Sequence, residues 1–137
     1  MGISVGAILT AILLGTTHIG SIDIRSKIIQ PSLERIMIES EEIIAKVTDL
    51  RVLILTMGSG QCLSWHHHSE VTETIFCSEG PIQVETRAPE GERILAPGEM
   101  MAITPGQSHK VSGINGGRCK VLLILGVGNW DFISDTE

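Results

Sequence analysis

The chain has 137 residues, the length of a single domain, and its 42% apolar and 19% charged residues exclude an intrinsically disordered protein. A net charge of -6, the lack of a local run of lysine or arginine, and an aromatic content of 3% exclude a surface that binds nucleic acid. The three cysteines form no CxxC pair, which excludes a zinc ribbon and a thioredoxin-like motif and predicts free thiols in a cytoplasmic protein.

An uncharged apolar stretch occupies residues 3–14. It is shorter than the roughly 20 residues of a membrane span, and no basic residue precedes it, as one would in a signal peptide. Three interpretations stay open: the stretch packs onto the main domain or a partner subunit, it precedes a true start at Met37, or it is a signal or anchor. We expect no membrane span elsewhere, and we divide the chain into an apolar extension over 1–36 and a domain over 37–137.

The next segment, residues 31–47, has an ambiguous pattern. Pro31 suits the first turn of a helix, and the apolar residues roughly follow one helical face, at Leu33, Ile36, Met37, Ile43, Ile44 and Val47. Several of them are β-branched, which also suits a strand. We therefore predict a short N-terminal extension of helical or strand character.

From Arg51 onward, short β-rich runs alternate with turns rich in glycine and proline. The predicted strands are 51–57, 62–68, 72–77, 82–87, 93–95, 100–104, 109–112 and 119–127. In the fourth of these runs, alternation places Ile82, Val84 and Thr86 on one face and polar residues on the other. Many short strands at near-regular spacing predict an all-β sandwich or barrel, a class that includes the jelly rolls.

The segment around residues 60–80 carries the residues that indicate chemistry. On a strand, residues two apart face the same way at a spacing of about 6.6 Å, so His66 and His68 can aim at one point while His67 faces away. A turn over 69–71 brings the next strand back alongside and lets Glu73 project to the same side. Imidazole nitrogens and a carboxylate together suit a first-row divalent metal.

These residues resemble the first motif of the cupins. That motif reads G-x5-H-x-H-x4-E-x6-G, and Gly60, His66, His68, Glu73 and Gly80 match it position for position. The chain is therefore identified as similar to the small single-domain cupins.

The second cupin motif, G-x5-P-x-G-x2-H-x3-N, also has its counterpart in the chain. Gly98, Gly106 and His109 match it, while Thr104 stands where the motif has proline and Gly113 where it has asparagine. Both departures concern the turn and a barrel hydrogen bond rather than the histidine ligand.

The resemblance implies a double-stranded β-helix, or jelly-roll, barrel. It further implies one divalent metal ion (Fe, Mn, Ni, Zn or Cu) held by His66, His68, Glu73 and His109, with one or two coordination positions open for a ligand. Small cupins commonly form homodimers, and the apolar N-terminus and residues 122–127 would suit such an interface.

Strand alternation predicts the neighbours of these ligands. Ser64 should share the inward face of His66 and His68, and Ile75 and Cys77 should share that of Glu73, so these three are candidate cavity-lining residues. A packing role is the simpler interpretation of Cys77. We expect core or interface positions for Trp65 and Trp130. We expect Arg87 to face solvent.

Two functions follow from this pattern. The first is a metal-dependent enzyme, of oxygenase, isomerase or lyase type, acting on a small organic acid, sugar acid or phenolic compound, and it is the one we favour. The second is a non-catalytic module that binds a small ligand. The chain has no tyrosine, and apart from the three ligands its histidines are His18 and His67. The lack of an obvious general acid or base favours chemistry performed by the metal itself, or simple binding.

Overall fold

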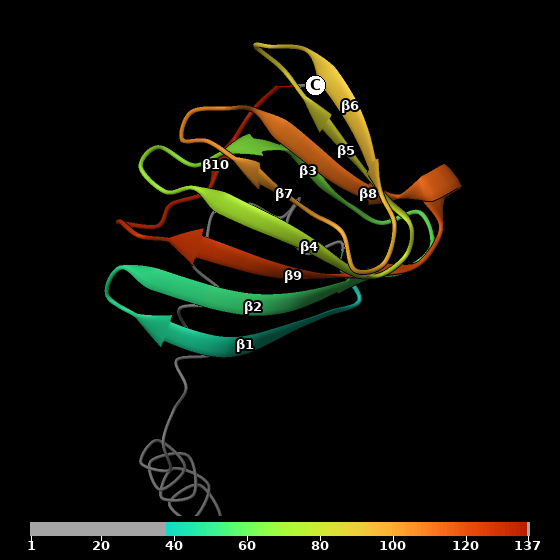
Figure 1. The fold of residues 1–137 in the computed structure, drawn as a ribbon, viewed down its shortest axis with the longest axis horizontal. Helices are drawn as coiled ribbons and strands as arrows, with labels where there is room; N and C mark the ends of the chain where they lie inside the picture. The colour runs from blue at the N-terminus through green and yellow to red at the C-terminus, as the bar shows by residue number, and fades with distance from the viewer. Residues whose placement is uncertain (1–37, 137) are drawn as a thin grey trace, which may run out of the picture. The chain divides into compact units, whose positions relative to one another are not determined.

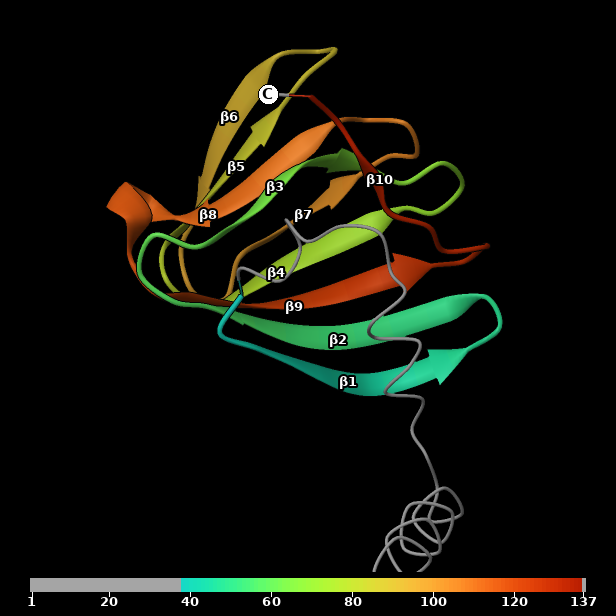
Figure 2. The same ribbon diagram turned by 180° about the vertical axis from the view of Figure 1, so that it is seen from behind.

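The computed structural model describes residues 38–136, which form two antiparallel sheets of five strands each (Figures 1 and 2). The first sheet has the order β1 (Ser40–Val47), β2 (Leu50–Met57), β9 (Cys119–Gly126), β4 (Glu73–Glu79) and β7 (Met100–Ile103). The second has the order β10 (Ile133–Ser134), β3 (Cys62–His67), β8 (His109–Gly113), β5 (Ile82–Thr86) and β6 (Gly91–Leu95). A single 3-10 turn, η3 (Ile114–Gly116), joins β8 to β9.

The chain passes back and forth between the sheets, because β2, β4, β7 and β9 belong to the first and β3, β5, β6, β8 and β10 to the second. This alternation gives the two facing layers seen in Figure 1. The prediction of an all-β jelly-roll barrel is thereby confirmed. Within residues 38–136, no helix has the length and apolar character needed to span a membrane.

All eight strands predicted from residue 51 onward are present, with ends that differ by a residue or two. The structure corrects the helical interpretation of residues 40–47, which form the edge strand β1 and pair with β2 along its whole length. Its apolar side chains Ile43, Ile44 and Val47 are exposed. They therefore bury no helical face, and the backbone pairing with β2 decides the conformation. The predictions for residues 1–36 lie outside the described residues.

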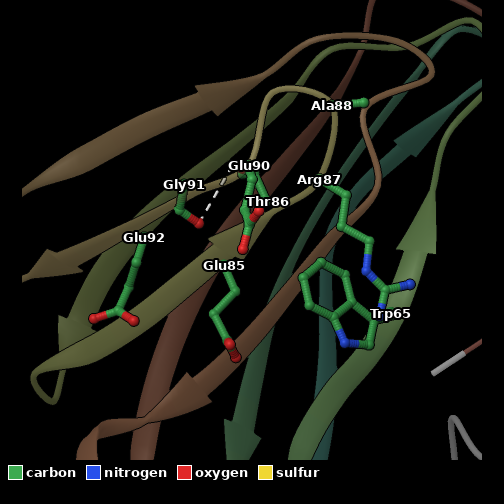
Figure 3. A pocket seen from close by; sticks show the side chains of 8 residues that line it. All are labelled: Trp65, Glu85, Thr86, Arg87, Ala88, Glu90, Gly91 and Glu92. Carbon is green, nitrogen blue, oxygen red and sulfur yellow. Dashed lines mark hydrogen bonds between the residues drawn. The ribbon is translucent and has the colours of Figure 1, made fainter.

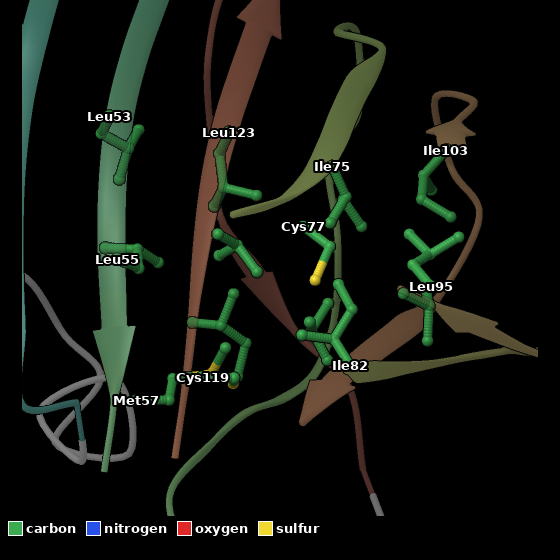
Figure 4. Packing of buried hydrophobic residues seen from close by; sticks show 14 of the residues in the cluster. Leu53, Leu55, Met57, Ile75, Cys77, Ile82, Leu95, Ile103, Cys119 and Leu123 are labelled. Carbon is green, nitrogen blue, oxygen red and sulfur yellow. The ribbon is translucent and has the colours of Figure 1, made fainter. Parts of the chain in front are cut away.

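The core lies between the two sheets, where alternate side chains of β4, β5, β8 and β9 are buried (Figure 4). The pattern predicted for β5 holds, since Ile82, Val84 and Thr86 are buried and the intervening residues are partly exposed. On β4 the buried positions are Glu73, Ile75 and Cys77. An apolar core on these strands holds the sheets together and fixes the direction of the polar side chains at their ends.

Two glycines of the second motif have structural roles that the sequence did not reveal. Gly106 has a φ of 78°, a left-handed conformation that glycine adopts without strain, and its N–H donates to the carbonyl of His68 at 2.7 Å. At Gly113, where the motif has asparagine, a Cβ would lie 1.8 Å from the carbonyl oxygen of Gly117. The close approach of the η3 turn thus explains why this chain has glycine there.

Candidate metal centre

The four predicted ligand residues come together where β3 ends and β4 and β8 begin. His66 lies near the end of β3, His68 follows that strand, and Glu73 and His109 begin β4 and β8. One ligand atom from each side chain lies within 4.8 Å of the others. All four residues are buried, the most exposed at 4%. Strands from both sheets therefore converge on one polar cluster, called the histidine–glutamate cluster below.

The register of β3 differs from the simple alternation that the sequence suggested. Leu63 pairs with Val111 and His66 with His109, so a bulge inserts one extra residue between these two pairs. Leu63 therefore occupies the buried, inward position that alternation had assigned to Ser64. The prediction that Ser64 shares the inward face is wrong for this reason, and what Ser64 offers the cluster is its carbonyl oxygen.

Each histidine of the cluster is anchored through its Nδ1 atom. The Nδ1–H of His66 donates to the Ser64 carbonyl at 2.7 Å, and that of His109 donates to the Gln107 carbonyl at 3.0 Å. The Nδ1–H of His68 donates to the Asp131 carbonyl. Since a carbonyl can only accept, each ring carries a proton on Nδ1 and turns its Nε2 towards the centre.

The three Nε2 atoms converge on a single oxygen, Oε2 of Glu73. The distances are 2.6 Å from His109, 3.2 Å from His68 and 3.9 Å from His66. An unprotonated imidazole nitrogen and a carboxylate oxygen are both acceptors, so such close approach requires a proton or a cation between them. Three nitrogens and a carboxylate directed at one point are the donor set of a divalent transition metal.

The electrostatics of the metal-free cluster reflect this crowding. Burial lowers the pKa of His66 to about 4, which favours its neutral form. Burial is the largest influence on His68 and opposes its charged form, but the hydrogen bond and charge of Glu73 together with the contacts to Asp131 outweigh it, and the net pKa is raised. For Glu73, burial acts to raise the pKa, yet the contacts with His109 and His68 hold it well below its usual range. Glu73 is thus an anionic carboxylate, as a metal ligand should be.

Several solved structures have a similar fold, and their sequence identities to this chain are low enough that the similarity shows the fold alone. A protein with a double-stranded β-helix domain from Klebsiella pneumoniae has a TM-score of 0.59 and 17% identity, over 71% of this chain and 84% of that one. A cupin-2 domain protein from Shewanella frigidimarina has a TM-score of 0.53 and 24% identity, over 76% and 92%. The chain has the cupin fold.

A third similar structure is an oxalate decarboxylase from Lactobacillus farciminis in complex with formate. It has a TM-score of 0.60 and 16% identity, and the match covers 69% of this chain but 30% of that longer one. No family model and no curated protein matches the sequence. The fold agrees with the resemblance drawn from the two motifs, while the activity has to be argued from the site.

The C-terminal segment of the chain packs against the histidine–glutamate cluster, and sequence reasoning did not predict this contact. Phe132 stacks on the ring of His66, with 4.3 Å between centroids and 15° between planes, and the Trp130 ring lies 6.5 Å from that of His68. Asp131, whose carbonyl anchors His68, accepts two hydrogen bonds from Ser69 through its carboxylate. No local pattern in the sequence relates this segment to residues more than 60 positions earlier.

The remaining predicted positions lie apart from the histidine–glutamate cluster. Ile75 and Cys77 are fully buried in the apolar core, and their lining of a ligand cavity stays a prediction. His67 faces away, as expected from its position between the ligands, and its Nδ1 contacts Asp135 at 2.9 Å. Arg87 is stacked on Trp65 beside a surface pocket of about 670 Å³, shown in Figure 3. This pocket lies over the β5–β6 hairpin and includes no cluster residue.

Proposed function

We propose that this cupin binds one divalent metal ion through His66, His68, Glu73 and His109 and acts as a metal-dependent enzyme on a small organic acid. The observation that carries the proposal is the convergence of three Nε2 atoms on Oε2 of Glu73. A cation at that point would replace repulsion between acceptors with four favourable contacts. One carboxylate and three neutral imidazoles would leave about one unit of positive charge, which favours an anionic ligand.

The metal would be one of Fe, Mn, Ni, Zn or Cu, and it would supply polarisation of a chelating ligand or of a water molecule. The residues of this chain would orient and shield the centre. Ser64, Gln107 and Asp131 hold the rings through their carbonyls, and such outer contacts strengthen metal binding. Phe132 covers His66 and limits the access of water. An oxygenase, isomerase or lyase reaction on a small organic acid, sugar acid or phenolic compound fits such a centre.

The alternative is a non-catalytic cupin module that binds a small ligand. It is favoured by the engagement of His67 with Asp135 on the other side of β3, because this histidine is then not directed at the cluster as a general base. The chain also contains no tyrosine. One of the structures with this fold is an oxalate decarboxylase in complex with formate. The fold is therefore compatible with a carboxylate as the substrate of an enzyme or as the ligand of a binding module.

Metal analysis of the purified protein tests the proposal. We expect about one equivalent of a first-row divalent metal per chain, as the four converging ligands imply, and none in the Glu73→Gln/His109→Ala double variant. A screen of organic acids that monitors oxygen uptake and product formation then separates the enzyme from the binding module. Protein that takes up no divalent metal under any loading condition would refute the metal-dependent enzyme.

We also propose a homodimer, supported by the outer face of the first sheet. There, Ile54, Leu122 and Phe76 form one cross-strand row, and Val52 and Ile124 form the next. Within residues 122–127, by contrast, Leu123 and Leu125 are buried in the core and are not available to a partner. We expect light scattering to give the mass of a dimer for the native chain and of a monomer for Ile124→Asp. A monomeric native chain would rule the dimer out.

A further inference from the structure

A buried arginine lies in the same cross-strand row as Glu73 of the histidine–glutamate cluster. Arg51, near the start of β2, is 9% exposed and occupies one of the inward positions of its strand. It pairs with Leu125 of β9, which in turn pairs with Glu73 of β4. Residues paired directly across a sheet face the same side, so Arg51 and Glu73 extend from one row on the same side of the sheet. With strands about 4.8 Å apart, their backbones lie about 10 Å apart.

The guanidinium of Arg51 is held between two groups. Its Nη2 donates to Oε1 of Glu41 at 2.8 Å, and its central carbon lies 4.2 Å from the centre of the Trp130 ring. The same indole lies 6.5 Å from the ring of His68. Trp130 is therefore a shared neighbour of the arginine and of a ligand of the proposed metal.

The hydrogen-bonding capacity of this arginine is only partly used. A guanidinium has five N–H donors in a planar fork that matches a carboxylate. The Nε of Arg51 is buried and has no acceptor among residues 38–136. A buried donor without a partner is costly, so a donor of this kind beside a reactive centre indicates an acceptor that comes from outside the protein.

We propose that Arg51 is a specificity-determining residue that recognises a second anionic group on the substrate. This inference rests on the proposed metal centre and narrows its substrate class to organic acids with two anionic groups a few carbon atoms apart. One group would bind at the histidine–glutamate cluster, and the other would accept from Nε of Arg51. The separation of about 10 Å between the strand positions of Arg51 and Glu73 suits a chain of about four carbon atoms between the two contacts. Glu41 keeps the guanidinium in place through Nη2.

The test compares succinate with its monoamide, succinamate, as probes of the metal-loaded protein in a calorimetric titration. Both offer one carboxylate to the metal, but only succinate has a second for Arg51. Hydrogen bonds between charged partners imply that the native protein prefers succinate by about 10- to 100-fold. In Arg51→Met this preference should fall to about 1 because the donor is lost, while metal content stays unchanged. In Glu41→Gln the preference should persist or increase, since the guanidinium loses a competing carboxylate.

Arg87→Met is the matched control, because Arg87 is also stacked on a tryptophan, at 3.8 Å from the Trp65 ring, but lies at the surface pocket away from the cluster. It should retain the native preference. If Arg51→Met does not fold, Arg51→Lys keeps the charge without the planar fork and should lower the preference only in part. A protein that loads metal but prefers neither probe, or an Arg51→Met variant with the native preference, overturns the assignment of Arg51. A protein that loads no metal instead refutes the proposed centre, and the inference falls with it.

Discussion

Replacing His66 with alanine should remove the metal and leave the fold in place. His66 supplies one of the four ligand atoms, and the loss of outer-sphere partners alone lowers metal affinity by about 10- to 100-fold. Loss of a direct ligand should therefore lower the affinity by more than about 100-fold. The cost to folding is smaller. The variant loses the hydrogen bond to the Ser64 carbonyl, about 1 kcal/mol, and the stacking on Phe132, about 1 kcal/mol.

His67→Ala is the control, because its neighbours on both sides are ligands while its own ring faces the opposite side of β3. It loses the contact with Asp135 between two side chains that are 26% and 22% exposed, which should cost less than about 1 kcal/mol. The assay is metal content after identical purification, with a metal-buffered titration for affinity and urea unfolding of the metal-free proteins for stability. If His67→Ala loses its metal and His66→Ala keeps it, the register of β3 and the ligand assignment are both refuted.

Three further predictions address the surroundings of the cluster. Asp131→Ala should lower metal affinity about 10-fold or more, because its carboxylate holds the segment whose carbonyl anchors His68. Asp135→Ala removes the contact with His67 and should leave the affinity near the native value. In metal-free protein, burial lowers the pKa of His66 from 6.5 to about 4, so between these pH values the unfolded chain binds a proton that the folded chain does not. The free energy of unfolding should therefore fall as the pH drops from 6.5 to about 4. Melting curves of His66→Ala, measured in a chelator, should lack this part of the fall. Iodoacetamide at pH 8 should modify half-exposed Cys62 and spare the buried Cys77 and Cys119. Burial raises the pKa of both buried thiols, to about 11 for Cys119. Equal labelling of all three cysteines in the native protein, measured by mass spectrometry, would contradict the buried positions.

The strands from residue 51 onward and three of the cluster residues, His66, His68 and Glu73, could be predicted because their signals are local. His109, 36 residues after Glu73, was predicted from the second motif of the family that the chain resembles. Alternation over a few residues identifies a strand and its inward face, as in Ile82, Val84 and Thr86. The spacing of His66, His68 and Glu73 needs only a strand, a tight turn and a returning strand to bring the side chains together. These relations span fewer than about ten residues, so the chain determines them without reference to distant segments.

The tertiary structure decided what depends on pairing between distant segments. The bulge that exchanges Leu63 for Ser64 arises from the register with β8, about 50 residues later in the chain. The conformation of β1 was settled by its partner β2 rather than by its own ambiguous pattern. The position of Arg51 beside Glu73 requires β9 between them, and its stacking on Trp130 requires the C-terminal segment to fold back over the barrel end. Sequence alone thus determined which residues form the histidine–glutamate cluster, whereas the groups that orient, cover and surround them depend on long-range contacts that no local pattern encodes.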